Sequence, residues 1–238
     1  MNHLLGSRYT IILAVLLVVA TATTTFAQQN VVSDATQECL DCHTAVTPGI
    51  VADWQKSRHS HTTPQDALAL PEIERRMSTA QVDETLHTVL IGCAECHTMN
   101  ADQNEKDRFE HNGFVIHTVV STSDCATCHP VEVEDFSHNL MSQAYANLMD
   151  NPVYKVMVDN TNGLATFNGA GFHHEGADDM SNADSCLACH GTIVQVTGSE
   201  TRETDMGEMD FPTLSNWPNA GVGRINPDGS KGACASCH

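Results

Sequence analysis

Ten cysteines and five histidines of this chain stand in one repeated pattern, in which two cysteines are separated by two residues and a histidine follows directly. In a helical turn, positions i, i+3 and i+4 lie on one face, so the two thiols and the imidazole point the same way. Such a group offers two sulfur nucleophiles and one metal ligand to a single bound molecule. The copies are Cys39, Cys42 and His43; Cys93, Cys96 and His97; Cys125, Cys128 and His129; Cys186, Cys189 and His190; and Cys234, Cys237 and His238.

One cysteine pair alone is weak evidence, because zinc knuckles and thiol redox pairs use the same spacing. A disulfide framework fits poorly, because it has no use for the histidine. Here a histidine follows every pair, and the five copies use all ten cysteines. The pattern therefore predicts five covalent haem c groups, each held by two thioether links, with the motif histidine as the proximal iron ligand.

Residues 1–27 are expected to be a secretory signal peptide. Arg8 supplies the positive start, and the apolar run from Ile11 to Ala20 is too short to span a bilayer comfortably. Thr25, Phe26 and Ala27 form a cleavage site of the small-x-small type. A retained membrane anchor is the alternative. We expect an exported protein, periplasmic or extracellular, in which residues 28–238 form one multihaem cytochrome c domain.

The charge of the chain limits its partners. The full sequence has 11 basic and 30 acidic residues, and removal of the expected signal deletes only Arg8, so the net charge passes from −19 to −20 with histidine neutral. A nucleic-acid partner is therefore not expected. The acidity provides solubility and favours docking to a basic redox partner protein.

The composition indicates a mainly α fold, with short helices and long loops packed around covalent haems. Aromatic residues are only 5% of the chain, so the side chains supply few large core groups. We expect the porphyrins to form the core and the chain not to fold without them. The first cysteines of successive motifs are 54, 32, 61 and 48 residues apart, and this irregularity argues against a repeat solenoid.

Local signals place a few elements between the motifs. Helices are expected from Thr63-Pro64, over Glu72 to Leu90 and over Val131 to Met149, with Pro71 and Asn151-Pro152 as breaks. The run from Phe114 to Val120 is strand-like. Asn162 to Gly176 and Thr197 to Gly223 are expected to be irregular. Asn226-Pro227-Asp228-Gly229 predicts a turn, because proline fixes φ and glycine supplies a positive φ.

A second histidine on an iron makes it six-coordinate and suited to electron transfer, whereas a haem without one keeps an open site for a small ligand. Fourteen histidines less the five proximal ones and His3 leave eight, and we expect at least three or four of them to be distal ligands. The methionines are alternatives. We favour His59, His117 and His138, then His111 and the His173/His174 pair, whereas His87 fits an exposed helix face equally well and His61 is the remaining one.

The mature chain from about Cys39 to His238 resembles the octahaem hydroxylamine oxidoreductase family of multihaem cytochromes c. The resemblance lies in the first motif followed by Pro48, Trp54, Ser57 and His59, in Ile91-Gly92 before the second motif, and in the loop from Gly221 to Ser230 before the fifth. It implies that His190 is the proximal ligand of the catalytic haem, whose iron has no distal protein ligand. It further implies oxidation of hydroxylamine or hydrazine, or reduction of nitrite or hydroxylamine, with the other haems as bis-histidine conduits and a redox partner protein or the quinone pool as electron partner. Trimers are common in the family.

The sequence departs from that family by ending at the fifth motif, where family members carry eight haems. We expect the sequence to be truncated after His238. The alternative is a pentahaem protein that completes its fifth site against another chain. Three functions stay open from the residues: an oxidoreductase of small nitrogen compounds at the His190 haem, a non-catalytic pentahaem electron carrier, and a cytochrome that polymerises through a shared terminal haem. The direction of catalysis is not assigned, because the family's distal pocket pair and cross-linking tyrosine lie beyond the fifth motif.

Overall fold

A computed structural model describes residues 31–238 except 101, 103–104, 218–219 and 237–238, so the expected signal peptide lies outside the described residues. The mainly α fold of short helices and long loops is confirmed. The α-helices are α2 (Asp34–Val46), α3 (Pro48–Lys56), α4 (Pro64–Ala69), α5 (Glu72–Arg75), α6 (Cys93–His97), α7 (Thr122–Cys125), α8 (Pro130–Ser137), α9 (Ala144–Met149), α10 (Pro152–Asn162), α11 (Asp179–Asp184) and α12 (Cys186–His190). Short 3₁₀ turns are η1 (Arg58–Ser60), η2 (Glu84–Leu86) and η4 (Cys234–Ser236).

The strands form two-stranded pairs rather than a common sheet. They are β1 (Val31–Val32) with β2 (Val89–Leu90), β3 (Arg108–His111) with β4 (Phe114–His117), β5 (Leu164–Phe167) with β6 (Phe172–Glu175), and β7 (Val196–Thr204) with β8 (Gly207–Leu214). Only the first pair is parallel. The strand predicted at Phe114 is confirmed, as is the turn at Pro227, where Gly229 has φ +88° and donates to Asn226.

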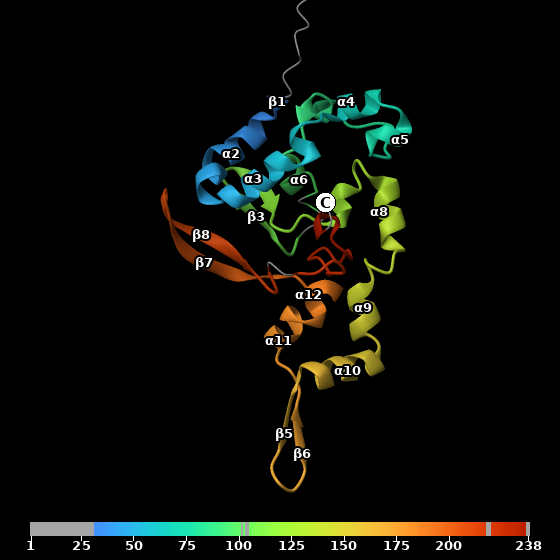
Figure 1. Cartoon of the computed structure of the whole chain (residues 1–238). Coiled ribbons are helices and arrows are strands. Elements are labelled where there is room, and N and C mark those ends of the chain that lie inside the picture. The colour runs from blue at the N-terminus through green and yellow to red at the C-terminus, as the bar shows by residue number, and fades with distance from the viewer. Residues whose placement is uncertain (1–30, 101, 103–104, 218–219, 237–238) are drawn as a thin grey trace, which may run out of the picture.

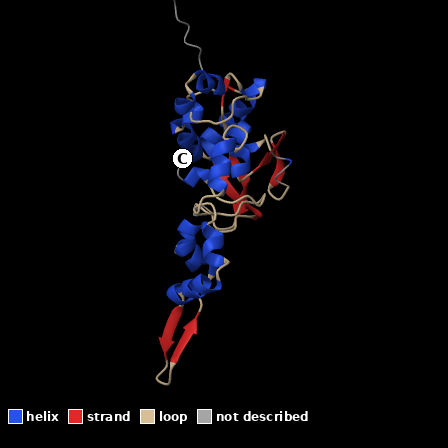
Figure 2. Cartoon of the chain, turned by 90° about the vertical axis from the view of Figure 1, so that its right-hand side faces the viewer, coloured by secondary structure: helices blue, strands red, loops and turns tan. Residues whose placement is uncertain are grey.

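The molecule is elongated, and its motifs divide between two regions (Figures 1 and 2). The upper region holds α2 to α8 with the β3–β4 hairpin and carries the first three motifs. The lower region holds α9 to α12 and carries the fourth. The β5–β6 hairpin projects from the far end of the lower region, and the β7–β8 hairpin projects from the side.

Two segments expected to be irregular are hairpins instead, and this expectation was wrong. In Asn162 to Gly176, β5 and β6 pair from Leu164 with Glu175 to Phe167 with Phe172. In Thr197 to Gly223, β7 and β8 pair as far as Thr204 with Gly207. Strands β5, β6 and β7 are exposed along nearly all of their length, and β8 is half-buried. Sequence patterns reveal strands mainly through the alternation that burial imposes, and exposed strands need not show it.

Two long helices were also predicted wrongly. The only α-helix in Glu72 to Leu90 is α5, because Arg76 takes a left-handed conformation with φ 54° and ends it after one turn. The 3₁₀ turn η2 and strand β2 follow in the same range. The helix expected over Val131 to Met149 is broken into α8 and α9. Asn151-Pro152 does stop α9, but it also starts α10, since the Asn151 side chain accepts from the Val153 amide.

The apolar core of the polypeptide is small. Twelve apolar residues are buried, among them Val119, Val194 and Ala220, which form one cluster with Leu214 beside it. Twenty large apolar side chains are exposed in the described part, so the chain buries less apolar surface than it presents. This imbalance is what the haem-core prediction requires, although the prediction that the chain does not fold without haem stays untested. None of the described helices is long and apolar enough to cross a membrane.

Candidate haem sites

Each described motif lies in a helical turn. The second and fourth motifs coincide with α6 and α12, and the first lies inside α2. The third begins at the end of α7, and its turn continues because the His129 amide donates to the Cys125 carbonyl (2.9 Å). The fifth begins at η4, whereas Cys237 and His238 lie outside the described residues. The predicted convergence of thiols and imidazole on one face is therefore present in the backbone.

The proximal histidines are held through Nδ1. The His97 ring donates from Nδ1 to the His117 carbonyl (2.8 Å), and the His190 ring donates to the Ala144 carbonyl (3.2 Å). Nδ1 of His43 is hydrogen bonded to the Thr47 hydroxyl (2.8 Å). A hydrogen bond at Nδ1 fixes the tautomer and leaves Nε2 as the nitrogen that binds a metal.

Two pairs of histidines face each other at a spacing that suits an iron between them. The ring centres of His43 and His111 are 6.0 Å apart, and those of His59 and His129 are 6.3 Å apart. Two imidazoles that bind one metal from opposite sides, at the ~2 Å of metal–imidazole bonds, have ring centres about 6 Å apart. Burial lowers the pKa of His43, and the facing His111 ring lowers it further. These residues fit a haem between the rings, with the second imidazole supplied by β3.

The His59 pair repeats this arrangement with a different element. Burial lowers the pKa of His59, and the neighbouring His129 ring adds to the effect. The neutral imidazole is the form that binds metals. His59 lies in η1, directly after α3, so a haem held by the third motif would tie α3 to α8.

The described motif thiols are partly shielded from solvent, except that of Cys189, which is exposed. Burial raises the pKa of Cys96 to about 12, and burial with the nearby Cys93 raises the pKa of Cys39 to about 11. Cys125 and Cys234 share a hydrogen bond, which raises the pKa of Cys125 and lowers that of Cys234 to about 7. The first cysteines of the third and fifth motifs therefore adjoin. Among the described residues, no three or more histidine, cysteine, aspartate or glutamate side chains converge as a metal site.

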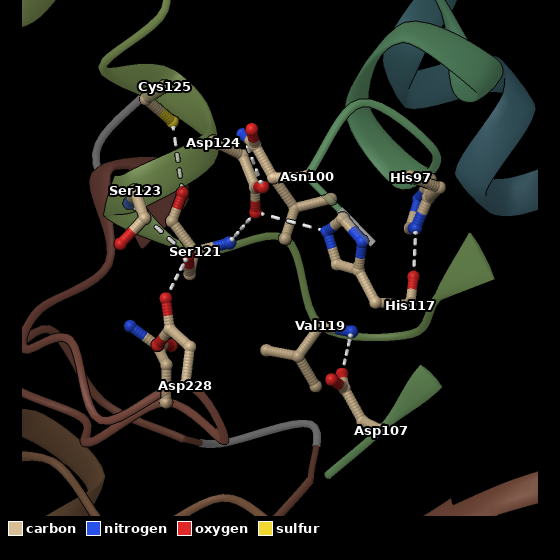
Figure 3. Close-up of polar contacts among 12 residues, drawn as sticks. His97, Asn100, Asp107, His117, Val119, Ser121, Ser123, Asp124, Cys125 and Asp228 are labelled. Carbon is tan, nitrogen blue, oxygen red and sulfur yellow. Dashed lines mark hydrogen bonds and ion pairs between the residues drawn. The ribbon is translucent and has the colours of Figure 1, made fainter. Parts of the chain in front are cut away.

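A buried hydrogen-bond network supports the second motif (Figure 3). His117 is fully buried, and its Nε2 lies 3.1 Å from the Asp124 carboxylate. Asp124 also accepts from the Ser121 amide (2.7 Å) and from the Asn100 side chain (3.0 Å). Burial alone would raise the pKa of Asp124, but these hydrogen bonds outweigh it and lower the pKa. Asp124 thus fixes the side chain of His117, and the backbone carbonyl of His117 in turn holds the His97 ring.

His117 does not fit as the distal ligand of the haem on His97. Its carbonyl accepts from Nδ1 of His97, on the side of that ring away from an iron bound to Nε2. With its backbone bonded to Nδ1 of His97, His117 would not also supply the second imidazole of the same haem, although the two ring centres are 6.0 Å apart. Its buried Nδ1 has no hydrogen-bond partner, so a ligand role toward another haem stays a prediction.

The other candidate ligands are dispersed. His87 donates from Nε2 to the Val82 carbonyl (2.8 Å), and His138 donates to the Glu134 carbonyl (3.0 Å) at the exposed end of α8. His61 follows η1 and is exposed. His173 and His174 lie on β6, where a Cβ added to Gly163 would meet Nε2 of His174 at 2.7 Å.

The fourth motif differs from the others in its exposure. The His190 side chain is exposed, and no histidine ring of the described residues faces it. Close backbone contacts hold it: a Cβ on Gly191 would lie 2.3 Å from the Gly223 carbonyl carbon, and one on Gly223 would lie 2.5 Å from the His190 oxygen. Beside its first cysteine, the Asn162 amide reaches Cys186 Sγ (3.9 Å).

Sequence reasoning missed three residues that the structure brings to these sites. Asp124 carried a signal, because Ser121 and Asp124 have the spacing of a capping box and form one. Asn162 and the buried Arg224 carried none, since the contacts that bring them to the motifs, with Cys186 and with Val120, join segments distant in the sequence.

Comparison with known proteins agrees with this arrangement. The sequence model of a family described as cytochrome c554 and c-prime matches residues 38–119 and 124–210, more than half of the chain. A probable nitrite reductase-hydroxylamine oxidoreductase fusion protein of Kuenenia stuttgartiensis is 28% identical over 107 residues, which are 42% of this chain and 11% of that protein. A solved structure described as a hypothetical multiheme protein is 42% identical with a TM-score of 0.78, and the match covers 90% of this chain and 42% of that one.

The chain thus spans less than half the length of the relatives it matches. The family match, the helical placement of the motifs and the facing histidines lead to one conclusion. The chain belongs to the cytochrome c554 and c-prime family and is a multihaem c-type cytochrome with covalently bound haem c, related to the hydroxylamine oxidoreductase-like proteins.

Proposed function

We propose that this exported chain carries five haem c groups and that the haem on His190 is the place where a small nitrogen compound exchanges electrons with them. The observation that carries the proposal is the contrast between the rings of His43 and His129, each faced by a second imidazole, and the exposed ring of His190, which none of the described histidines faces. Haem with one protein ligand binds small molecules at the open iron position, whereas bis-histidine haem passes electrons.

The conducting haems are those of the upper region. His43 with His111 and His59 with His129 are the proposed axial pairs of the first and third haems. Cys39 lies near Cys93 and Cys125 adjoins Cys234, so the first attachment site is close to the second, and the third is close to the fifth. Closely spaced haems are what electron transfer through a protein requires. A basic redox partner protein or the quinone pool would exchange electrons with the chain.

The residues at the fourth motif hold one ring and leave space around it. Cys186 and Cys189 would attach the haem, and the Ala144 carbonyl orients His190 by accepting from Nδ1. Bound there, haem supplies an iron that changes oxidation state and takes a small nitrogen ligand. Both the oxidation of hydroxylamine or hydrazine and the reduction of nitrite or hydroxylamine are within that chemistry.

The test uses the full chain produced with c-type haem maturation. Mass spectrometry should give a gain of five haems over the processed polypeptide. Electron paramagnetic resonance should give a high-spin signal that hydroxylamine or nitrite alters, and turnover of either compound should follow. Five haems with only low-spin iron and no response to these compounds would contradict the catalytic part.

The electron-carrier alternative has one structural argument in its favour. His174 lies beside Gly163, and the residue before that glycine, Asn162, contacts Cys186, so His174 is a candidate imidazole for the fourth motif. If His174 binds that iron, the high-spin signal is absent in the native protein and appears in His174→Ala. The same variant leaves the signal unchanged if the iron is open.

A further inference from the structure

We propose that Arg224 binds a propionate carboxylate of a haem attached at the third, fourth or fifth motif, and that its charge raises the reduction potential of that haem. The inference rests on the proposed haem content but not on the proposed catalysis. Arg224 follows the Gly221–Gly223 turn and belongs to none of the haem motifs.

The guanidinium of Arg224 is buried and makes no ion pair with any carboxylate of the described residues. The residue is 7% exposed, and its Nε donates to Asn226 Oδ1 (2.6 Å) while Nη2 donates to the Val120 carbonyl (2.6 Å). Both acceptors are neutral. Among the described residues, no carboxylate lies within the 4.0 Å of an ion pair with it. Arginine is rarely buried unless it is paired, because removing a charge from water is costly.

The nearest acidic groups do not supply the missing anion. Asp228 is close enough to affect the pKa of Arg224, but its carboxylate accepts from the hydroxyls of Ser121 (2.8 Å) and Ser230 (2.7 Å). The Cys125 and Cys234 thiols are also near. Haem attachment converts them into neutral thioethers, so they lose the ability to become anions. The Trp217 ring centre, 5.9 Å from the guanidinium carbon, offers only a weak cation–π contact.

The position of Arg224 brings it to the junction of three attachment segments. Its side chain reaches Val120, just before α7 and the third motif, and its near neighbours include Cys234 of the fifth. Its backbone abuts Gly191, directly after His190, because a Cβ on Gly191 would meet the Arg224 amide nitrogen at 2.4 Å. Each haem carries two propionates, so the cofactors would bring to this junction carboxylates that can contact the guanidinium directly, which no carboxylate of the described residues does.

The chemistry of the guanidinium suits such a group. Arginine has five N–H donors, of which the two contacts above use two. Its planar fork binds a carboxylate through two parallel hydrogen bonds. A positive charge near a haem stabilises the reduced state, which has one more electron, and therefore raises the potential.

The experiment compares Arg224→Gln, Arg224→Lys and a control, Arg202→Gln, in the full haem-loaded chain. Arg202 is exposed on β7 and pairs with Glu200 at the surface. The readouts are haem count by mass spectrometry, potentials by spectroelectrochemistry, and the propionate bending modes in resonance Raman spectra.

We expect Arg224→Gln to favour oxidation of one or two haems at least tenfold, which is a fall in reduction potential of about 59 mV for a one-electron centre, and to shift their propionate modes. Arg224→Lys should keep most of the potential but shift the modes, and Arg202→Gln should change neither.

Unchanged potentials in Arg224→Gln would overturn the inference, and so would a lower potential with unaltered propionate modes, because the charge would then act without contact. If Arg224→Gln does not fold, Arg224→Lys carries the test through the propionate modes alone. The proposed haem content fails separately, when the unsubstituted chain gives a haem count below five.

Discussion

The upper and lower regions of the molecule treat their motif histidines differently. In the upper region, the rings of His43 and His129 are faced by a second imidazole, and His97 is held by a network that includes a buried carboxylate. In the lower region, the exposed His190 ring makes one hydrogen bond, to the backbone carbonyl of Ala144. One five-residue pattern thus serves two environments, and the residues around the motif decide whether its iron can meet a small molecule.

The largest expected effect comes from removing haem attachment in one region or the other. Cys125→Ala with Cys128→Ala should prevent stable folding, because the third haem would link η1 to α8 and its first cysteine adjoins Cys234. A structural metal centre contributes on the order of 10 kcal/mol to folding, which is comparable with the whole stability of a domain, about 5–15 kcal/mol. Yield and thermal unfolding of the haem-loaded protein measure this effect.

The matched variant is Cys186→Ala with Cys189→Ala in the lower region. It should fold with four haems, keep the low-spin signals and lose the high-spin signal and the response to hydroxylamine or nitrite. The two regions would be equivalent if both double variants failed to fold or if both folded with equal stability.

The second prediction concerns the facing imidazoles. His59→Ala and His111→Ala should each convert one haem from low-spin to high-spin, because each removes one of two axial nitrogens. Electron paramagnetic resonance counts the high-spin haems, and added imidazole should restore the low-spin state. His87→Ala is the control, since that ring donates to the Val82 carbonyl and should leave every spin state unchanged. An unaltered spectrum in either ligand variant would contradict the proposal that the substituted histidine binds the same iron as the motif histidine that it faces.

The pairing also marks the limit of what the sequence could predict. The motifs were found because their chemistry lies within five residues, and their helical turns follow from the same local spacing. The ligand pairs join segments far apart in the chain, such as η1 with α8, so spacing gave no means to rank His111 above His117. The exposed strands β5, β6 and β7 were missed because little of them is buried, and no alternation of apolar and polar residues marks them. In β8, Met209 and Phe211 alternate with Glu208 and Asp210, so that strand did carry a short signal.

The third prediction tests the close backbone contacts of the lower region. Gly191→Ala should lower stability and disturb the His190 haem, because φ at Gly191 is +104° and the new Cβ would lie 2.3 Å from the Gly223 carbonyl carbon. Crowding in a packed site costs typically 1–3 kcal/mol. Thermal unfolding and the high-spin signal measure the two effects.

Gly113→Ala is its matched control in the upper region. Gly113 also has a positive φ, +82°, but nothing lies within 4 Å of its added Cβ. It should therefore show only the cost of the left-handed conformation, roughly 1–2 kcal/mol, and no change in any haem spectrum. Equal effects of the two substitutions on the high-spin signal would mean that the Gly191 contact does not position His190.

The smallest effect is expected from Asp124→Asn, which tests whether the buried carboxylate of the upper region acts on His97 through His117. Asparagine keeps the shape and one acceptor oxygen. Oδ2 of Asp124 contacts both the Ser121 amide and His117, and Oδ1 accepts from Asn100, so an asparagine oxygen at Oδ2 keeps the first two contacts and loses the third, together with the negative charge. Loss of a hydrogen bond to a buried charged group costs about 1.5–3 kcal/mol. The reduction potential of the His97 haem should shift slightly, because a less firmly held His117 carbonyl is a weaker hydrogen-bond acceptor for Nδ1 of His97.

Asp228→Asn is the control, since it disturbs a neighbouring carboxylate that does not contact His117. If Asp124→Asn lowers stability without changing the His97 haem, Asp124 acts only as a capping residue of α7. The different haem environments of the upper and lower regions would then come from the facing imidazoles and not from the hydrogen-bond network around Asp124.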